Sequence, residues 1–178
     1  VTNMEGMFQA SSFNQPIGNW DVSAVTKMTY MFGGASSFNQ TIGQWNTSNV
    51  TNFGNMFTNA TQFNQNLGDW NTSKITNMGN MFRGASRYNQ PIGEWDTSCV
   101  KYLNGMFYGA ISFNQIIGDW NTSKVTNMNH MFYNASKFNQ PVGDWDTSNV
   151  TDFGHMFYGT SFNQPIQKWD TSNVINMK

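Results

Sequence analysis

The amino-acid sequence predicts a repeat solenoid of about seven coils, in which each coil stacks only on its neighbours. The first observation is that the seven tryptophans recur at intervals of 25 residues, the last of which is 24. The second is that a whole motif recurs with them, as in WNTSKVTNMNHMFYNASKFNQPVGD from Trp120 to Asp144. The third is that no boundary or linker interrupts the repeat. We therefore expect residues 1–178 to form one solenoid domain, and a segment of a longer array, since the sequence starts and stops within a repeat.

The amino-acid composition argues against a nucleic-acid-binding protein and against a membrane-spanning one. Charged residues make up 11% of the chain and the net charge is −1, so no electrostatic attraction to nucleic acid is expected. No apolar run approaches the roughly 18 residues that a membrane-spanning segment needs, so we expect no membrane insertion by this segment. The single cysteine, Cys99, cannot form an internal disulfide. The 7 Trp, 15 Phe and 12 Met supply the core.

The first half of each repeat has helical spacing. Counting repeat positions from Trp as zero, positions 4 to 13 predict a short α or 3₁₀ helix. In the fifth unit one face would carry Val125, Met128, Met131, Phe132 and Ala135. A serine at position 3, such as Ser123, is the expected N-cap, and Asp or Asn two residues earlier suits an Asx turn.

The end of this segment is also predictable. One position holds only glycine or asparagine, the two residues that most readily take the left-handed conformation after a helix. These residues are Gly34, Asn59, Gly84, Gly109, Asn134 and Gly159. We therefore expect the chain to turn here in every copy.

The second half of each repeat is predicted to be extended. Phe138–Gly143 fits a short strand that stacks in parallel on its copies, about 4.8 Å apart. An Asn-Gln pair occurs in all seven copies, from Asn14-Gln15 to Asn163-Gln164. We expect these amides to form a ladder along the solenoid, and the glycine that follows to permit a tight bend before Trp.

The pattern WDTSNVTxMxxMFxxAxxFNQPIG resembles the BspA-like leucine-rich-repeat surface proteins, in particular the mycoplasma-type surface-protein repeat. The resemblance covers essentially all of the chain. It implies a leucine-rich-repeat-like solenoid exposed outside the cell, often as one segment of a larger adhesin. Met, Phe and Trp replace most of the leucines. The resemblance brings no catalytic motif.

One edge of the predicted solenoid collects aromatic and imidazole side chains. Tyr108, Tyr133 and Tyr158 share position 13 in three consecutive units, after Arg83 in the preceding unit. His130 and His155 precede two of them by three residues, which makes them neighbours on a helix. Because tyrosine is favoured at interfaces, these five residues are the candidate ligand-binding residues. The alternative is drift among exposed positions. Two histidines without a third ligand do not make a metal site.

Other columns have structural interpretations beside functional ones. Asp69, Glu94, Asp119 and Asp144 form an acidic column, which is either a cation site or a solvated rim partly neutralised by Lys74 and Lys124. The two methionine rows are expected in the core rather than in a metal site. The tryptophan column is expected there too. Two columns of threonine favour capping and turn roles over an ice-binding face.

Seven N-x-[ST] sequons are candidate glycosylation sites for a secretory route, or cap and turn residues. They begin at Asn46, Asn49, Asn59, Asn71, Asn121, Asn134 and Asn149. No catalytic arrangement, phosphate-binding loop or metal-ligand spacing is present, so we expect neither an enzyme nor a cofactor.

The resemblance, together with the aromatic edge, implies an extracellular or cell-surface adhesion or recognition module whose partner is a protein or a glycan. The alternative is a structural protein that assembles head to tail through uncapped ends, where strand edges would be open to pairing.

Overall fold

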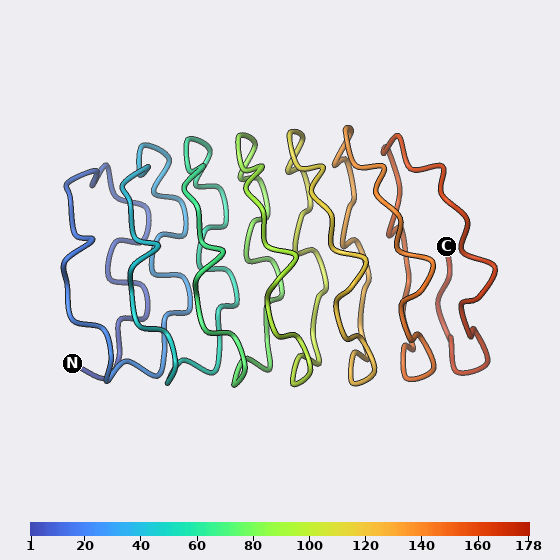
Figure 1. Ribbon diagram of the computed structural model, residues 1–178. Coiled ribbons are helices and arrows are strands. Elements are labelled where there is room, and N and C mark those ends of the chain that lie inside the picture. Colours follow the sequence, from blue (N-terminus) through green and yellow to red (C-terminus); the bar gives the residue numbers. More distant parts are fainter.

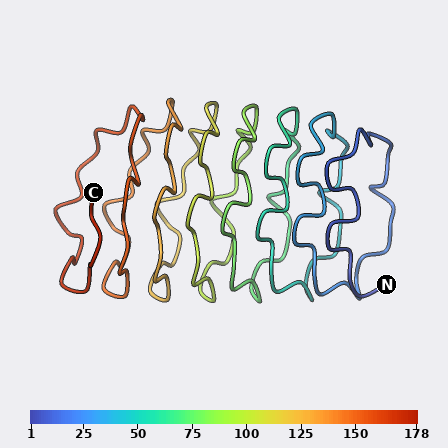
Figure 2. The same cartoon turned by 180° about the vertical axis from the view of Figure 1, so that it is seen from behind.

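The computed structural model describes residues 1–178, and the chain winds through it as coils laid side by side from one terminus to the other (Figure 1). The view from behind shows the same order of coils (Figure 2). Seven isolated parallel bridges join equivalent residues of successive coils. They run through Asn3, Lys27, Asn52, Asn77, Tyr102, Asn127, Asp152 and Asn176. Each coil therefore contacts the next through residues that are 24 or 25 positions apart.

The first half of each repeat consists of consecutive turns, and the predicted helix is wrong. In residues 103–110 the backbone N–H groups alternate between two kinds of partner. Met106 N donates to Leu103 O within the coil (3.2 Å), whereas Phe107 N donates to Met131 O of the next coil (2.8 Å). An α-helix would instead pair each N–H group beyond its first turn with the carbonyl four residues earlier in the same segment. The chain contains no helix, and hence none long and apolar enough to cross a membrane.

The predicted strand is also misplaced. Residues 138–143 form no strand, and the bridges lie at position 7, inside the segment expected to be helical. The Asn-Gln ladder does exist in residues 138–143 and their counterparts. Asn64 Oδ1 accepts the backbone N–H of Asn89 (2.9 Å) and the side-chain amide of Gln90 (3.1 Å) from the next coil. The asparagine side chain therefore replaces a backbone carbonyl as the acceptor between coils.

Two local predictions at the turns are confirmed. Asx turns precede the segment, as where Ser98 N donates to Asp96 Oδ1 (3.0 Å). The serine acts as the donor in this turn and not as a helix N-cap. All six glycines and asparagines of position 14 have positive φ, for example +75° at Gly34 and +54° at Asn134. A second left-handed position, represented by His130 (φ 54°), was not predicted.

The core is one cluster of 46 buried residues that runs along the whole stack. Its rings form columns, in which Phe32, Phe57 and Phe82 follow one another with centroids 5.5 and 5.7 Å apart. Ten of the twelve methionines are buried, and the two exposed ones, Met7 and Met177, lie in the first and last coils. Aromatic stacking and apolar burial thus hold each coil to the next.

Polar side chains inside the stack bond to the adjacent coil. The indole Nε1 of Trp95 donates to Leu67 O of the preceding coil (3.0 Å), and five other tryptophans make the equivalent bond. The buried Thr97 hydroxyl donates to Asn121 O of the next coil (3.1 Å). This threonine column therefore joins coils rather than capping a helix, and being buried, it cannot form an ice-binding face.

The glycine before each tryptophan allows the coils to approach closely. A Cβ on Gly43 would lie 2.6 Å from Asn66 O in the next coil. No real Cβ comes so near a backbone oxygen. The glycine is therefore needed for contact between coils, in addition to any bend that it permits.

Candidate ligand-binding site

Position 13 lies immediately before the left-handed glycine or asparagine, and the turn there directs its side chain away from the core. Arg83, Tyr108, Tyr133 and Tyr158 occupy this position in four successive coils. The Arg83 guanidinium carbon lies 4.0 Å from the Tyr108 ring centroid. The next two ring-to-ring distances are 4.6 Å (Tyr108–Tyr133) and 4.7 Å (Tyr133–Tyr158). We call these four residues the tyrosine edge.

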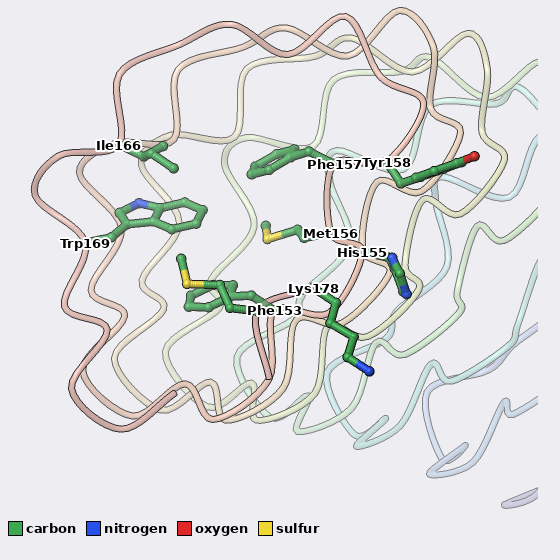
Figure 3. A pocket seen from close by; sticks show the side chains of 9 residues that line it. Phe153, His155, Met156, Phe157, Tyr158, Ile166, Trp169 and Lys178 are labelled. Atoms are coloured by element: carbon green, nitrogen blue, oxygen red, sulfur yellow. The ribbon is translucent and has the colours of Figure 1, made fainter. Parts of the chain in front are cut away.

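The two histidines lie beside the tyrosine edge. The imidazole centroids of His130 and His155 are 5.2 Å apart, and His130 lies 5.5 Å from the Tyr133 ring. His155 meets the rings of Tyr133 and Tyr158 edge-on. The structure thus brings together all five predicted binding residues. Figure 3 shows His155 and Tyr158 pointing outward from the last coils, away from Phe157 and Trp169.

The surroundings change the acidity of two of these groups. Burial lowers the pKa of His130 below its ordinary value of 6.5, and the imidazole of His155 lowers it further, against the opposing effect of Asp152. Desolvation in the stack raises the pKa of Tyr133 above 10.0, with the hydroxyls of Tyr158 and Tyr108 adding to the shift. At neutral pH the rings of His130 and Tyr133 are therefore neutral, beside the fixed positive charge of Arg83.

A depression of about 380 Å³ opens at the arginine end of the tyrosine edge. It is lined by Asn80, Arg83, Asn104, Gly105, Tyr108, Asn129 and His130. Gly105 stands at repeat position 10, where the neighbouring coils carry Asn80 and His130. The depression therefore lies where this column has no side chain. Sequence reasoning did not find this depression, although a glycine in a column of larger residues was the available signal.

The acidic column does not converge on one point. Asp69, Glu94 and Asp119 line a groove of about 560 Å³, and Asp144 forms the only ion pair of the structure, with Lys168 (2.6 Å). No group of three His, Cys, Asp or Glu side chains is placed to hold a metal ion. Lys74 Nζ donates to Asn49 Oδ1 (2.9 Å), and neither Lys74 nor Lys124 forms an ion pair with the acidic column.

The sequon asparagines are exposed, but they differ in what their amides do. The amide nitrogens of Asn49 and Asn149 donate to the carbonyl oxygens of Ser23 and Ser123 (2.8 and 2.7 Å). At the other five the amide nitrogen donates no hydrogen bond; these are Asn46, Asn59, Asn71, Asn121 and Asn134. Their carbonyl oxygens or backbones serve Asx turns or left-handed turns, as the structural alternative expected.

Comparison with known proteins gives one family and no individual relative. No curated protein matches, and no solved structure matches. The family model described as "Mycoplasma protein of unknown function, DUF285" matches twice, over residues 1–92 and 83–178. The two matches together span the chain and agree with its repeated sequence. The chain therefore belongs to the family of mycoplasma proteins of unknown function DUF285.

Proposed function

We propose that this protein is a cell-surface adhesion or recognition module that binds a glycan or protein partner through the tyrosine edge. The observation that carries the proposal is the unbroken row of Arg83, Tyr108, Tyr133 and Tyr158 on the outside of the stack. Tyr158 is 58% exposed, although its ring is large and apolar. Tyrosine and arginine are enriched in binding interfaces, where one rigid side chain offers both apolar area and a hydrogen-bonding group.

The arrangement of the rings limits how a partner makes contact. Tyr108 and Tyr133 lie nearly parallel, at 10°, and Tyr133 and Tyr158 at 14°. Each ring covers the face of the next, and Arg83 covers the outer face of Tyr108. A partner alongside the stack therefore meets ring edges and hydroxyls rather than ring faces. Hydrogen bonding to the row of hydroxyls is the expected mode of contact.

We place the protein at the cell surface and its fold among leucine-rich-repeat-like solenoids of the BspA type. Support comes from the 25-residue repeat, from the stacked coils and from membership of a mycoplasma family. The edge offers recognition chemistry without a nucleophile or a paired acid and base. We accordingly propose binding and not catalysis.

Adhesion of coated beads tests this function. Beads carrying the wild-type protein are expected to attach to cultured host cells or to matrix-coated plates. A triple variant with Tyr108, Tyr133 and Tyr158 changed to serine is expected to lose most of that attachment. Tyr30→Ser is the matched control, because Tyr30 is also exposed but lies outside the tyrosine edge. Circular dichroism checks that both proteins are folded. Equal attachment by the triple variant and the wild type then contradicts the proposal.

A second candidate function is head-to-tail assembly, and the faces of the first and last coils favour it. The last coil has an apolar hollow of about 310 Å³ lined by Phe153, Met156 and Trp169, among others (Figure 3). Within the stack, Phe132 N donates to Met156 O of the following coil (3.0 Å). The equivalent Phe157 N has no such partner here. A second copy, or a further coil of a longer chain, would supply one.

Electron microscopy of the purified chain over a range of concentrations tests this candidate. Filaments of constant width that lengthen with concentration support assembly through the end faces. A Phe157→Asp change, which puts a charge into that face, is then expected to leave short rods. Uniform short rods of the wild-type protein at every concentration contradict the candidate.

A further inference from the structure

The depression beside Tyr108 lies where one residue of a column lacks a side chain. Gly105 forms its floor, between the side chains of Asn80 and His130 in the flanking coils. Gly105 has a φ of +60°, and Asn80 Oδ1 occupies the space where its Cβ would lie. The hollow is a feature of the lateral surface of the stack. It is independent of what lies beyond either end of the chain.

The guanidinium of Arg83 is held in place but has no polar partner. It lies over the Tyr108 ring, and its side chain makes no hydrogen bond and no ion pair. No carboxylate lines the depression. The nearby carboxylate of Asp152 is occupied, since it accepts N–H groups from Gly154 (2.8 Å), Asn129 (2.8 Å) and Asn176 (2.9 Å). The arginine donors therefore remain available to an anion that enters the depression.

Amide side chains supply the rest of the polar lining. Asn80, Asn104 and Asn129 each carry a donor and an acceptor, and His130 is neutral at pH 7 because its pKa is lowered. Groups that both donate and accept suit hydroxyls, which do the same. One cation surrounded by several amides thus complements a ligand that bears one carboxylate and several hydroxyls.

We propose that this depression binds a carboxylate-bearing sugar unit of a glycan, with its carboxylate on Arg83 and its hydroxyls on the asparagine amides. The inference rests on the proposed recognition function and names the ligand class for its glycan form. The side chain of a protein aspartate or glutamate would occupy only a small part of about 380 Å³ and leave the amides of Asn80 and Asn104 without partners. A neutral sugar would leave the Arg83 donors unused. A sugar acid uses both.

The test compares methyl β-D-glucuronide with methyl β-D-glucoside, which differ only in the carboxylate that replaces a hydroxymethyl group. Each is titrated into the isotope-labelled 178-residue chain, and the shifts of the side-chain amides of Asn80, Asn104 and Asn129 are followed by NMR. We expect the glucuronide to bind roughly tenfold more tightly, the effect of one hydrogen-bonded charge pair. We also expect that preference to weaken as salt is added.

Three variants assign the effect to this site. Arg83→Gln is expected to remove the preference for glucuronide over glucoside. Arg87→Gln is the matched control, because this exposed arginine of the same coil lies outside the depression and its loss changes the net charge equally. Gly105→Asn puts a side chain into the depression, where it must displace the flexible side chain of Asn80. Asparagine already occupies this repeat position with positive φ at Asn55 and Asn80. The Gly105→Asn variant is expected to weaken binding of both sugars at least tenfold.

Failure of this inference is distinguishable from failure of the recognition function. Equal affinity for the two sugars, or a preference that survives Arg83→Gln, overturns the assignment of the carboxylate to Arg83. If neither sugar shifts the side-chain amide signals of Asn80, Asn104 and Asn129, even at the highest concentration, the sugar site is overturned altogether. The bead assay reports separately on the tyrosines, so attachment that depends on them while both sugars fail to bind leaves a protein partner as the ligand.

Discussion

The ring of Tyr88 stacks at 6.4 Å from that of Phe113 in a buried column, yet its hydroxyl has no hydrogen-bond partner. The other residues at this repeat position are phenylalanines, among them Phe63 and Phe138. Burial also raises the pKa of Tyr88 well above 10.0, since the surroundings cannot solvate a phenolate. One coil of the stack thus carries a polar atom that the fold leaves unsatisfied, at a cost in free energy.

Replacing Tyr88 by phenylalanine is expected to stabilise the protein. The change removes the unsatisfied hydroxyl and keeps the stacked ring, so the free energy of unfolding should rise by about 1–3 kcal/mol. Urea denaturation followed by tryptophan fluorescence measures it. Phe113→Tyr is the converse control and should destabilise by a similar amount. A Tyr88→Phe variant less stable than the wild type would mean that the hydroxyl has a partner in solution.

Gly43 is expected to tolerate no side chain. A Cβ there would lie 2.6 Å from Asn66 O, so the alanine variant must push two coils apart and should lose about 1–3 kcal/mol of unfolding free energy. Gly68→Ala is the control, because its Cβ would lie 3.2 Å from the side-chain Oδ1 of Asn66 and 3.4 Å from Pro91 O. Thermal unfolding of both variants measures the difference. An equal loss at the two sites would show that contact distance between coils is not the cause.

The buried threonine column is expected to stabilise the stack through its hydroxyls. Thr97→Val keeps the side-chain shape but leaves Asn121 O without this donor, at a cost of about 1 kcal/mol. Thr76→Val changes an exposed hydroxyl that donates to Thr51 O (3.3 Å) and should cost less than about 0.5 kcal/mol. Chemical denaturation of the two variants measures the free energy of unfolding of each. An equal loss in both variants would contradict a stabilising role of the buried hydroxyl.

Stability is expected to fall as the pH drops below about 6.5 because of His130. Its pKa is lower in the folded protein than in the unfolded chain, so the unfolded chain binds the proton first. The loss begins at the unfolded pKa of 6.5 and stops growing below the folded pKa. The groups that face the imidazole are His155, Asp152 and Arg83, together with the neutral rings of Tyr108 and Tyr133.

His130→Asn tests this dependence. Asparagine already occupies the same repeat position at Asn55 and Asn80 and takes the left-handed conformation readily, so the fold should persist. The difference in unfolding free energy between pH 7.5 and pH 5.0 should be smaller in the variant than in the wild type. Parallel pH profiles for the two proteins would contradict the assignment to His130.

Much of the architecture follows from local and periodic features that the sequence alone contains. The 25-residue period places equivalent residues side by side, and the apolar positions identify the core, as the buried columns through Phe57 and Trp95 confirm. Glycine or asparagine at position 14 determines a left-handed turn, because few other residues adopt it without strain. The same period predicts that Tyr108, Tyr133 and Tyr158 lie side by side, and the structure places them so.

Tertiary structure decided how the backbone hydrogen bonds are shared. From Leu103 to Ala110 the N–H groups divide between the coil's own carbonyls and those of the next coil, which converts a helical spacing into a series of turns. The sequence of a single repeat cannot distinguish a helix from such a series of turns, because the spacing of apolar residues is the same in both structures. The depression at Gly105 likewise depends on three coils at once. The sequence determined which residues form columns, whereas only packing between coils determined where a depression opens among them.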